Sequence, residues 1–391
     1  MGYAGLNPMT WMDDDLGALR ERDRLRMPST LAYRDATHAT LEGREVTVMC
    51  GNDYLGLRHH PALLRAANHA TNEHGSGAGA SRLVSGHLSF HQEVEEYFAR
   101  HLGAGSSLLS ASGYGANVGA LAALLSSDDV VFSDALNHAS LIDGIRLSRA
   151  QVVVVPHNDV DALRKAVRAT TRHRRAWIVT ESLFSMDGDL SPMAELEEIA
   201  LEHGCQRYVD EAHAIGVIGP EGRGLCYGMA NPPDVRMIGF GKALGGSGAL
   251  LAGPGSLRPW LWNHSRSFIF STGIAPGPAA AARRASELIA SDPSLLQGLR
   301  TNIAVLHQAL NSVGITTVAT HPAVPILPVI IGDDRRAVEV GRALLERGYF
   351  VHPIRPPTVP VGTARLRITV SAAHDPDELR AFAGVLAEVL S

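Results

Sequence analysis

Short apolar runs recur along the first two thirds of the chain, and segments with helical periodicity separate them. The runs lie at residues 106–112, 152–156, 176–182, 207–213 and 236–241. Strands separated by helix-length segments are typical of crossover units, in which successive strands lie parallel in one buried sheet. The pattern therefore predicts an α/β core built on a mostly parallel sheet.

One strand departs from this rule. The apolar run SGALLAG at 247–253 follows the run at 236–241 after a tight turn that leaves no room for a crossover helix. Because parallel neighbours need a connection of about a dozen residues or more, we expect this strand to pair antiparallel with its neighbour.

The last third of the chain has a different pattern. It contains a helical segment at 282–290, a proline-interrupted strand at 323–331, a further helix, and a final strand and helix at 365–390. These elements predict a second, smaller α+β domain. We expect an N-terminal arm over 1–50, a large domain over 51–282 and a small C-terminal domain over 283–391.

Composition excludes several classes of partner. The chain has 391 residues, 45% of them hydrophobic, and a formal net charge of −5, so it offers no basic field for nucleic acid. Its three cysteines are widely spaced and fit neither a disulfide framework nor a zinc motif, so we expect no metal and a reducing compartment. The N-terminus lacks a signal-peptide pattern, and no apolar run approaches the roughly 18 residues of a membrane span. We expect a cytoplasmic protein with no membrane partner.

Chemistry-bearing residues gather at the expected strand ends, where open α/β sheets bind ligands. Asp210 closes the run RYVD, and Lys242 follows the next strand in the glycine-rich stretch GFGKALGGSG. Ser112, Gly113 and Tyr114 open a helix whose free N–H groups can hold a phosphate. The ATP-loop and dinucleotide-binding glycine motifs are both absent. An amine, a strand-end carboxylate and an anion site are the set that pyridoxal 5′-phosphate (PLP) needs.

A series of longer motifs carries a family resemblance over most of the chain. The segments are NDYLGL (52–57), GSGAGASRLVSGH (75–87), SGYGAN (112–117), NHASLIDG (137–144), ESLFSMDGDLSP (181–192), VDEAHAIGVIGPEGRG (209–224), FGKALGGSG (240–248) and GTARLRITVSAAH (362–374). Together and in this order they resemble the α-oxoamine synthases, which are fold-type I PLP enzymes. The resemblance implies a large domain with a mostly parallel seven-stranded sheet flanked by helices, a smaller C-terminal α+β domain and an N-terminal helical arm.

The resemblance also implies the roles of three catalytic residues. Lys242 would bind the cofactor aldehyde as a Schiff base and later take the amino acid's α-proton. Asp210 would keep the pyridine nitrogen protonated, which makes the ring an electron sink. His138 would lie flat against the ring.

Further residues are implied to bind the cofactor. His213 and Ser185 would bond its phenolic oxygen, and the helix start at Ser112, Gly113 and Tyr114 would hold its phosphate. Thr272 would contact that phosphate from a second subunit. The resemblance therefore implies a homodimer with its active sites at the interface.

Two residues are implied to read the substrate carboxylate, Arg367 and its support Asn52. Arg365 and Arg367 lie two apart on a strand and share a face, so periodicity does not choose between them, while the family pattern selects Arg367. Arg26 aligns loosely with a substrate-contacting arginine of the family, but an arginine in LRERDRLRMP is more typical of a helix surface, and we do not assign it to the site.

One position departs from the family pattern. Gly239 stands where the family usually has a serine or threonine that bonds the phosphate. The missing hydrogen bond is worth about 0.5–1.5 kcal/mol, so we expect weaker cofactor binding unless Ser247, Ser112 or Thr272 compensates.

The implied reaction joins an L-amino acid to an acyl thioester on coenzyme A or a carrier protein, with loss of carbon dioxide and thiol. The segment RPPTVPVGTARLRI (355–368) favours the branch that joins L-alanine to a pimeloyl thioester in biotin synthesis. Glycine or serine with another thioester, including a role in specialised metabolism, stays open. A non-catalytic partner subunit of the same fold is the remaining alternative, and the presence of Lys242, Asp210 and His138 argues against it.

Overall fold

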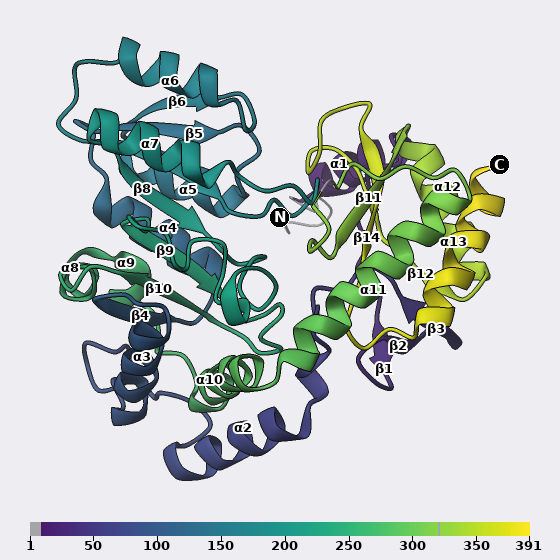
Figure 1. Ribbon diagram of the computed structural model, residues 1–391, viewed down its shortest axis with the longest axis horizontal. Helices are drawn as coiled ribbons and strands as arrows, with labels where there is room; N and C mark the ends of the chain where they lie inside the picture. The colour runs from purple at the N-terminus through teal and green to yellow at the C-terminus, as the bar shows by residue number, and fades with distance from the viewer. Residues whose placement is uncertain (1–8, 320) are drawn as a thin grey trace, which may run out of the picture.

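A seven-stranded sheet forms the centre of the larger of two lobes in the computed structural model, which describes residues 9–319 and 321–391 (Figure 1). Its strands lie in the order β4 (Ser106–Ser110), β10 (Ala249–Gly253), β9 (Val235–Gly239), β8 (Gln206–Asp210), β7 (Ala176–Glu181), β5 (Val130–Asp134) and β6 (Gln151–Val155). The five strands from β9 to β6 run parallel, whereas β10 pairs antiparallel with both β9 and β4. The predicted mostly parallel sheet and its antiparallel exception are both confirmed.

Helices cover both faces of this sheet, which explains why its central strands are mostly apolar and buried. On one face α4 (Gly113–Leu124) and α5 (Ala139–Ser148) pack over side chains such as Val131 and Tyr208. On the other, α6 (Val160–Ala169) and α7 (Met193–His203) cover residues such as Phe132. Every residue of β7, β9 and β10 is buried, as expected for strands covered on both sides.

Other helices close one edge of the larger lobe. They are α2 (Pro61–His74), which follows the short 3-10 helix η1 (Leu57–His59), α3 (Ser89–His101), α8 (Leu257–His264), α9 (Arg266–Ile269) and α10 (Pro276–Ser291), with a second 3-10 turn, η2, at Pro220–Gly222. The predicted domain boundary at 283 falls inside α10. This helix approaches α2 so closely that a Cβ at Gly277 would lie 2.7 Å from the Thr71 hydroxyl. The three-domain division stays a prediction.

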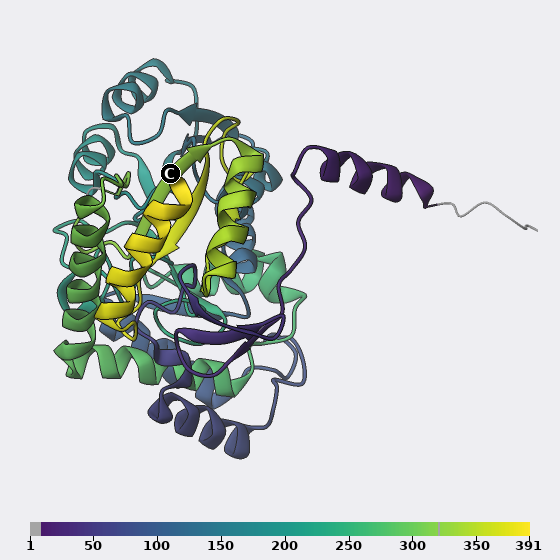
Figure 2. The same cartoon turned by 90° about the vertical axis from the view of Figure 1, so that its right-hand side faces the viewer.

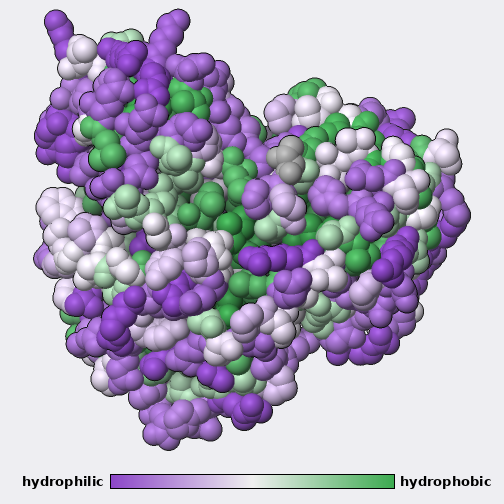
Figure 3. Space-filling view, viewed as in Figure 1, coloured by the Kyte–Doolittle hydropathy of each residue, from purple (hydrophilic) through white to green (hydrophobic). Residues whose placement is uncertain are grey.

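The smaller lobe is built on a three-stranded sheet in the order β11 (Ile326–Gly332), β14 (Ala364–Thr369) and β13 (Pro353–Ile354). The helices α11 (Pro293–Ser312), α12 (Asp334–Glu346) and α13 (Pro376–Leu390) accompany it. All six residues of β14 are buried, including two arginines. Figure 3 shows apolar side chains along the junction of the two lobes.

The N-terminal segment joins the smaller lobe. The strands β1 (Leu31–Tyr33), β2 (His38–Leu41) and β3 (Arg44–Val48) form a sheet that β12 (Tyr349–Phe350) completes by pairing parallel with β3. Before them, α1 (Thr10–Glu21) buries no residue and stands clear of the rest of the chain (Figure 2). Residues 1–8 of the predicted arm lie outside the described residues. Across 9–319 and 321–391, no helix has the length and apolarity that crossing a bilayer requires.

Candidate active site

The carboxyl ends of β7, β8 and β9 meet at a cavity of about 310 Å³. Most of the predicted site residues line it: Asn52, Ser112, Gly113, Tyr114, His138, Asp210 and Lys242. These residues are up to 190 positions apart in sequence. The direction of the strands brings all of them to one edge of the sheet except Asn52, which lies in the segment between β3 and η1.

Lys242 lies in the turn between β9 and β10. The Phe240 N–H donates to the Gly248 carbonyl at 2.9 Å, and the Gly245 N–H donates to the Lys242 carbonyl at 2.8 Å. Gly245 has φ +61°, and a Cβ there would lie 2.6 Å from the backbone nitrogen of Arg58. Glycine is therefore required at 245 by both conformation and space, and the turn presents Lys242 to the cavity.

Burial and the neighbouring carboxylates shift the pKa of Lys242 in opposite directions. Burial lowers the pKa of the Lys242 ammonium to about 8, while Asp210 and Glu181 act in the other direction. Burial, with the nearby charge of Asp210, raises the pKa of the Glu181 carboxyl to about 8. The cavity therefore holds an amine and a carboxyl group that both titrate near neutral pH.

The Asp210 carboxylate is fixed at the end of β8 by two donors. Asn117 Nδ2 donates to Oδ2 at 2.8 Å, and the Ala212 N–H donates to Oδ1 at 2.8 Å. The Asn117 amide is itself oriented, because its Oδ1 accepts from the Tyr208 hydroxyl at 2.8 Å. Asp210 is thus a buried, oriented carboxylate, which would suit a protonated ring nitrogen.

The start of α4 offers an anion site. Ser112 caps the helix, and its Oγ accepts from the Gly115 N–H at 3.0 Å. The N–H groups of Gly113 and Tyr114 have no acceptor among the described residues. Two free N–H groups at a helix N-terminus suit a phosphate, as the sequence predicted.

His138 caps α5 at the mouth of the cavity. Its backbone N–H donates to Glu181 Oε1 at 2.7 Å, and its Nδ1 lies 2.7 Å from the Ser140 hydroxyl. Its ring meets the Tyr114 ring edge-on, with the centroids 6.3 Å apart. Desolvation and the Lys242 charge lower the pKa of His138 against the opposing effect of Asp210, which favours the neutral ring and suits stacking.

Three predicted cofactor-binding residues, His213, Ser185 and Thr272, are not among the residues that line this cavity. His213 is buried with its Nδ1 2.8 Å from the Tyr54 hydroxyl, and burial holds its pKa well below the usual value. Ser185 lines a neighbouring cavity of about 300 Å³. Thr272 is exposed and bridges to Ser81 on the outside of the lobe. Within one chain, the Lys242 cavity is therefore lined by neither Ser185 nor Thr272, and a contact from Thr272 to a second subunit stays a prediction.

The partners of the two β14 arginines distinguish them. Arg367 is buried, and its Nη2 donates to Asn52 Oδ1 at 3.1 Å and to the Tyr54 hydroxyl at 3.2 Å. Arg365 instead forms an ion pair with Asp187 at 2.5 Å. Among the described residues Arg367 has no acidic partner, so its charge is available to a carboxylate beside Asn52, whereas the charge of Arg365 is already paired.

Sequence reasoning missed several residues of the site. Glu181, Asn117, Ala212 and Met237 also line the cavity. Glu181 opens the motif ESLFSMDGDLSP and Asn117 ends SGYGAN, so the motifs contained them. Nothing in their spacing indicated that they face Lys242.

Packing explains the glycine at position 239. A Cβ there would lie 2.9 Å from the Ala212 Cβ, which is closer than packed carbon atoms approach. Ser247 and Ser112 line the cavity, and the Ser112 hydroxyl can still donate although its oxygen caps α4. Compensation for the missing hydroxyl by Ser247, Ser112 or Thr272 stays a prediction.

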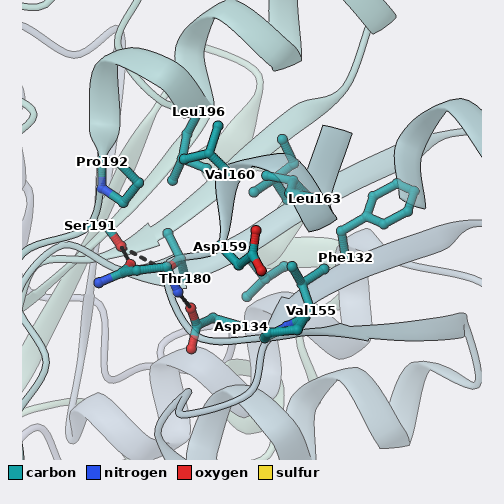
Figure 4. Close-up of a pocket in the computed structure, with 14 residues that line it drawn as sticks. Phe132, Asp134, Val155, Asp159, Val160, Leu163, Thr180, Ser191, Pro192 and Leu196 are labelled. Atoms are coloured by element: carbon teal, nitrogen blue, oxygen red, sulfur yellow. Dashed lines mark hydrogen bonds between the residues drawn. The ribbon is translucent and has the colours of Figure 1, made fainter. Parts of the chain in front are cut away.

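A further pocket of about 30 Å³, shown in Figure 4, lies between β5, β7 and α6. Aliphatic and aromatic side chains such as Phe132, Val160 and Leu163 line it, and its Thr180 and Ser191 hydroxyls bond each other at 3.0 Å. None of the predicted site residues reaches it. Its size and lining do not suit a phosphorylated cofactor.

The residues of the Lys242 cavity fit PLP. The α4 N-terminus has free donors for the phosphate, Asp210 is an oriented carboxylate for the ring nitrogen, and Lys242 is an amine of lowered pKa for the aldehyde. When bound, PLP supplies an electron sink for carbanions next to the amino nitrogen.

Comparison with known proteins agrees with this fit. Residues 44–386 match the family model described as aminotransferase class I and II. The chain is 43% identical to an 8-amino-7-oxononanoate synthase of Geobacter sulfurreducens, over 96% of each chain, and 45% identical to one of an Anaeromyxobacter species, over 98% of this chain and 96% of the relative. A solved serine palmitoyltransferase of S. paucimobilis with bound PLP and myriocin is 26% identical, covers 98% of both chains and superposes with a TM-score of 0.92.

These matches span nearly the whole chain and include every element that builds the cavity. The predicted fold and cofactor are confirmed. The chain belongs to the aminotransferase class I and II family, in which it is a PLP-dependent acyltransferase of the α-oxoamine synthase group.

Proposed function

We propose that the protein condenses L-alanine with a pimeloyl thioester, carried on coenzyme A or a carrier protein, to give 8-amino-7-oxononanoate for biotin synthesis. The observation that carries the proposal is the arrangement of Lys242 and Asp210 in one cavity, beside which Arg367 donates a hydrogen bond to the lining residue Asn52 and has no acidic partner among the residues described. The names of the 43–45% identical relatives support the choice of substrates.

The chain's residues divide the work. Arg367 and Asn52 hold the amino acid's carboxylate, and Lys242 accepts its α-proton, because an amine with a pKa of about 8 is partly neutral at pH 7. Asp210 holds the proton on the ring nitrogen, and the neutral His138 ring covers the cavity mouth.

The reaction forms one carbon–carbon bond. It breaks the bonds from the α-carbon to hydrogen and to the carboxylate, and the carbon–sulfur bond of the thioester. The α-carbon of the amino acid forms a bond to the thioester carbonyl carbon, and the carbon–sulfur bond breaks. The thiolate takes a proton, the carboxylate leaves as carbon dioxide, and the electron pair it leaves on the α-carbon takes another proton. One of these protons is the α-proton that Lys242 accepted, and the other comes from water.

We also propose that the protein works as a homodimer, with Thr272 contacting the phosphate of the partner's site. Thr272 and its neighbour Phe270, which is 70% exposed, lie on the surface of the single chain. Sedimentation equilibrium of the purified protein tests the dimer.

The substrate test is a panel measurement. The protein with PLP is mixed with L-alanine, glycine or L-serine and with acyl thioesters from acetyl to palmitoyl, and both thiol release and product mass are measured. Release with alanine and pimeloyl thioester supports the proposal. Preference for serine and palmitoyl thioester, the pair suggested by the name of the structural neighbour, would contradict it.

A further inference from the structure

A histidine outside the cavity is bonded to carboxylates on both ring nitrogens. His157, which follows β6, has Nδ1 2.9 Å from Asp134 Oδ1 and Nε2 2.7 Å from Asp189 Oδ2. Its ring also meets Phe184 edge-on at 4.4 Å. Each carboxylate accepts only if the ring nitrogen facing it carries a proton, so the geometry calls for the doubly protonated ring.

The two carboxylates belong to separate segments of the site. Asp134 ends β5, and its Oδ1 also accepts from the Leu136 N–H at 2.8 Å, two residues before His138. Asp189 lies in the segment 182–192 between β7 and α7, which we call the bridging loop. His157 therefore joins the segment that carries His138 to the bridging loop.

The bridging loop in turn contacts the smaller lobe. The Ser185 carbonyl accepts from Arg367 Nε at 2.5 Å, and Asp187 pairs with Arg365. At Gly188, which has φ +67°, a Cβ would lie 2.4 Å from the Ile326 carbonyl oxygen, so the loop touches β11 directly. The loop thus sets where Arg367 stands relative to the larger lobe.

We propose that His157 is a positioning residue. It fixes the position of the carboxylate-binding Arg367, in the smaller lobe, relative to His138 in the larger lobe. The route is short. From His157 it passes through Asp134 to the segment before His138, and through Asp189 and the bridging loop to the Ser185 carbonyl and Arg367. The Asn158 amide also donates to Asp189 Oδ2 at 2.7 Å, which fixes that carboxylate further.

Charge supports the proposal. Although partial burial acts against it, the bonds to Asp134 and Asp189 raise the pKa of His157 to about 10. The groups that face the ring are these two carboxylates, Phe184 and the Asn158 amide, and no cation is among the described residues that contact it. His157 therefore keeps its bonds to both carboxylates, and with them the relative position of His138 and Arg367, throughout the physiological pH range.

The proposal rests on the proposed amino-acid chemistry, so its test measures amino-acid binding without any thioester. L-alanine, glycine and L-serine are titrated into the PLP-loaded protein, and the dissociation constant is read from the cofactor's absorption. We expect His157→Gln and Asp189→Asn each to raise the dissociation constant for the amino acid about tenfold, because misplacing Arg367 weakens carboxylate binding. His173→Gln, the same change in an exposed loop, leaves it unchanged.

A second measurement needs no substrate. In ¹⁵N-histidine-labelled protein at pH 8, the signals that His157→Gln removes should be those of a doubly protonated ring. Signals of a neutral ring, or unchanged amino-acid binding in a folded His157→Gln protein, would overturn the proposal. If His157→Gln does not fold, Asp189→Asn decides through the same titration. If the unmutated protein binds amino acids but does not turn over any thioester, that result would contradict the proposed substrates and not the role of His157.

Discussion

The two sides of the cavity are held in different ways. On the cofactor side, Lys242, Asp210 and Glu181 follow or end three neighbouring strands of one sheet, and Glu181 and Asp210 are paired in the β7–β8 register. On the substrate side, Arg367 comes from the smaller lobe and is oriented by Asn52 and by the Ser185 carbonyl of the bridging loop.

This difference separates the expected effects of mutation. With the proposed roles, changes on the cofactor side remove groups that act on the reacting atoms, so we expect them to lower kcat. Changes on the substrate side leave those groups in place and weaken carboxylate binding, so they raise KM. The following variants test this separation, from the largest expected effect to the smallest.

Lys242→Ala removes the amine of the cofactor side and should have the largest effect of these variants. We expect kcat to fall by about 10⁴-fold or more, because no other amine lines the cavity among the described residues. The chain contains only one other lysine, Lys165, which is exposed on α6. Borohydride reduction followed by peptide mass analysis should find the cofactor on Lys242. Lys165→Ala is the matched control, and cofactor trapped on Lys165 would contradict the assignment.

Asp210→Asn tests the charge on the ring nitrogen while preserving shape. We expect kcat to fall by roughly 10²–10³-fold with the fold intact, because a neutral amide does not stabilise a protonated ring nitrogen. Steady-state kinetics and the cofactor's absorption spectrum measure the effect. Asp161→Asn, on the exposed start of α6, makes the same chemical change away from the site. A loss of less than threefold would show that Asp210 does not face the ring.

Arg367→Lys tests the substrate side. Lysine keeps the charge but lacks the planar fork, so we expect the KM for the amino acid to rise roughly 10- to 100-fold while kcat changes by less than about threefold. The control is Arg365→Lys two residues away, which acts on Arg367 only through the bridging loop. It should raise KM much less than Arg367→Lys does and lower the melting temperature through its weakened pair with Asp187. A larger KM effect at Arg365 would reverse the assignment.

Glu181→Gln tests the buried carboxyl group. A carboxyl whose pKa is raised to about 8 in the folded protein, from 4.5, binds a proton that the unfolded chain has lost, so the folded protein loses stability as pH rises from about 4.5 to 8. Glutamine does not titrate. We expect the variant's stability relative to the parent to increase by on the order of 3 kcal/mol between pH 5 and pH 8. Urea unfolding at the two pH values measures it, and a constant difference would contradict the raised pKa.

Most of the cofactor side was accessible from sequence. Apolar runs separated by helices indicated the parallel sheet, and strand-end residues of a parallel sheet share an edge, so Asp210, Lys242 and the start of α4 were expected together. The short turn after Lys242 also indicated the antiparallel β10. These are consequences of local pattern and strand direction, which neighbouring residues encode.

The sequence by itself therefore determined the sheet, the family and the cofactor, whereas only the tertiary structure decided which charges are paired. Arg365 and Arg367 share a face of one strand, and Asp187, nearly 180 residues away, distinguishes them by pairing with the first alone. Likewise, burial beside Asp210 raises the pKa of Glu181, and the carboxylates of Asp134, at the end of β5, and Asp189, in the bridging loop, bond both ring nitrogens of His157. The physical reason is that burial and charge pairing depend on residues distant in the chain, which no local pattern specifies.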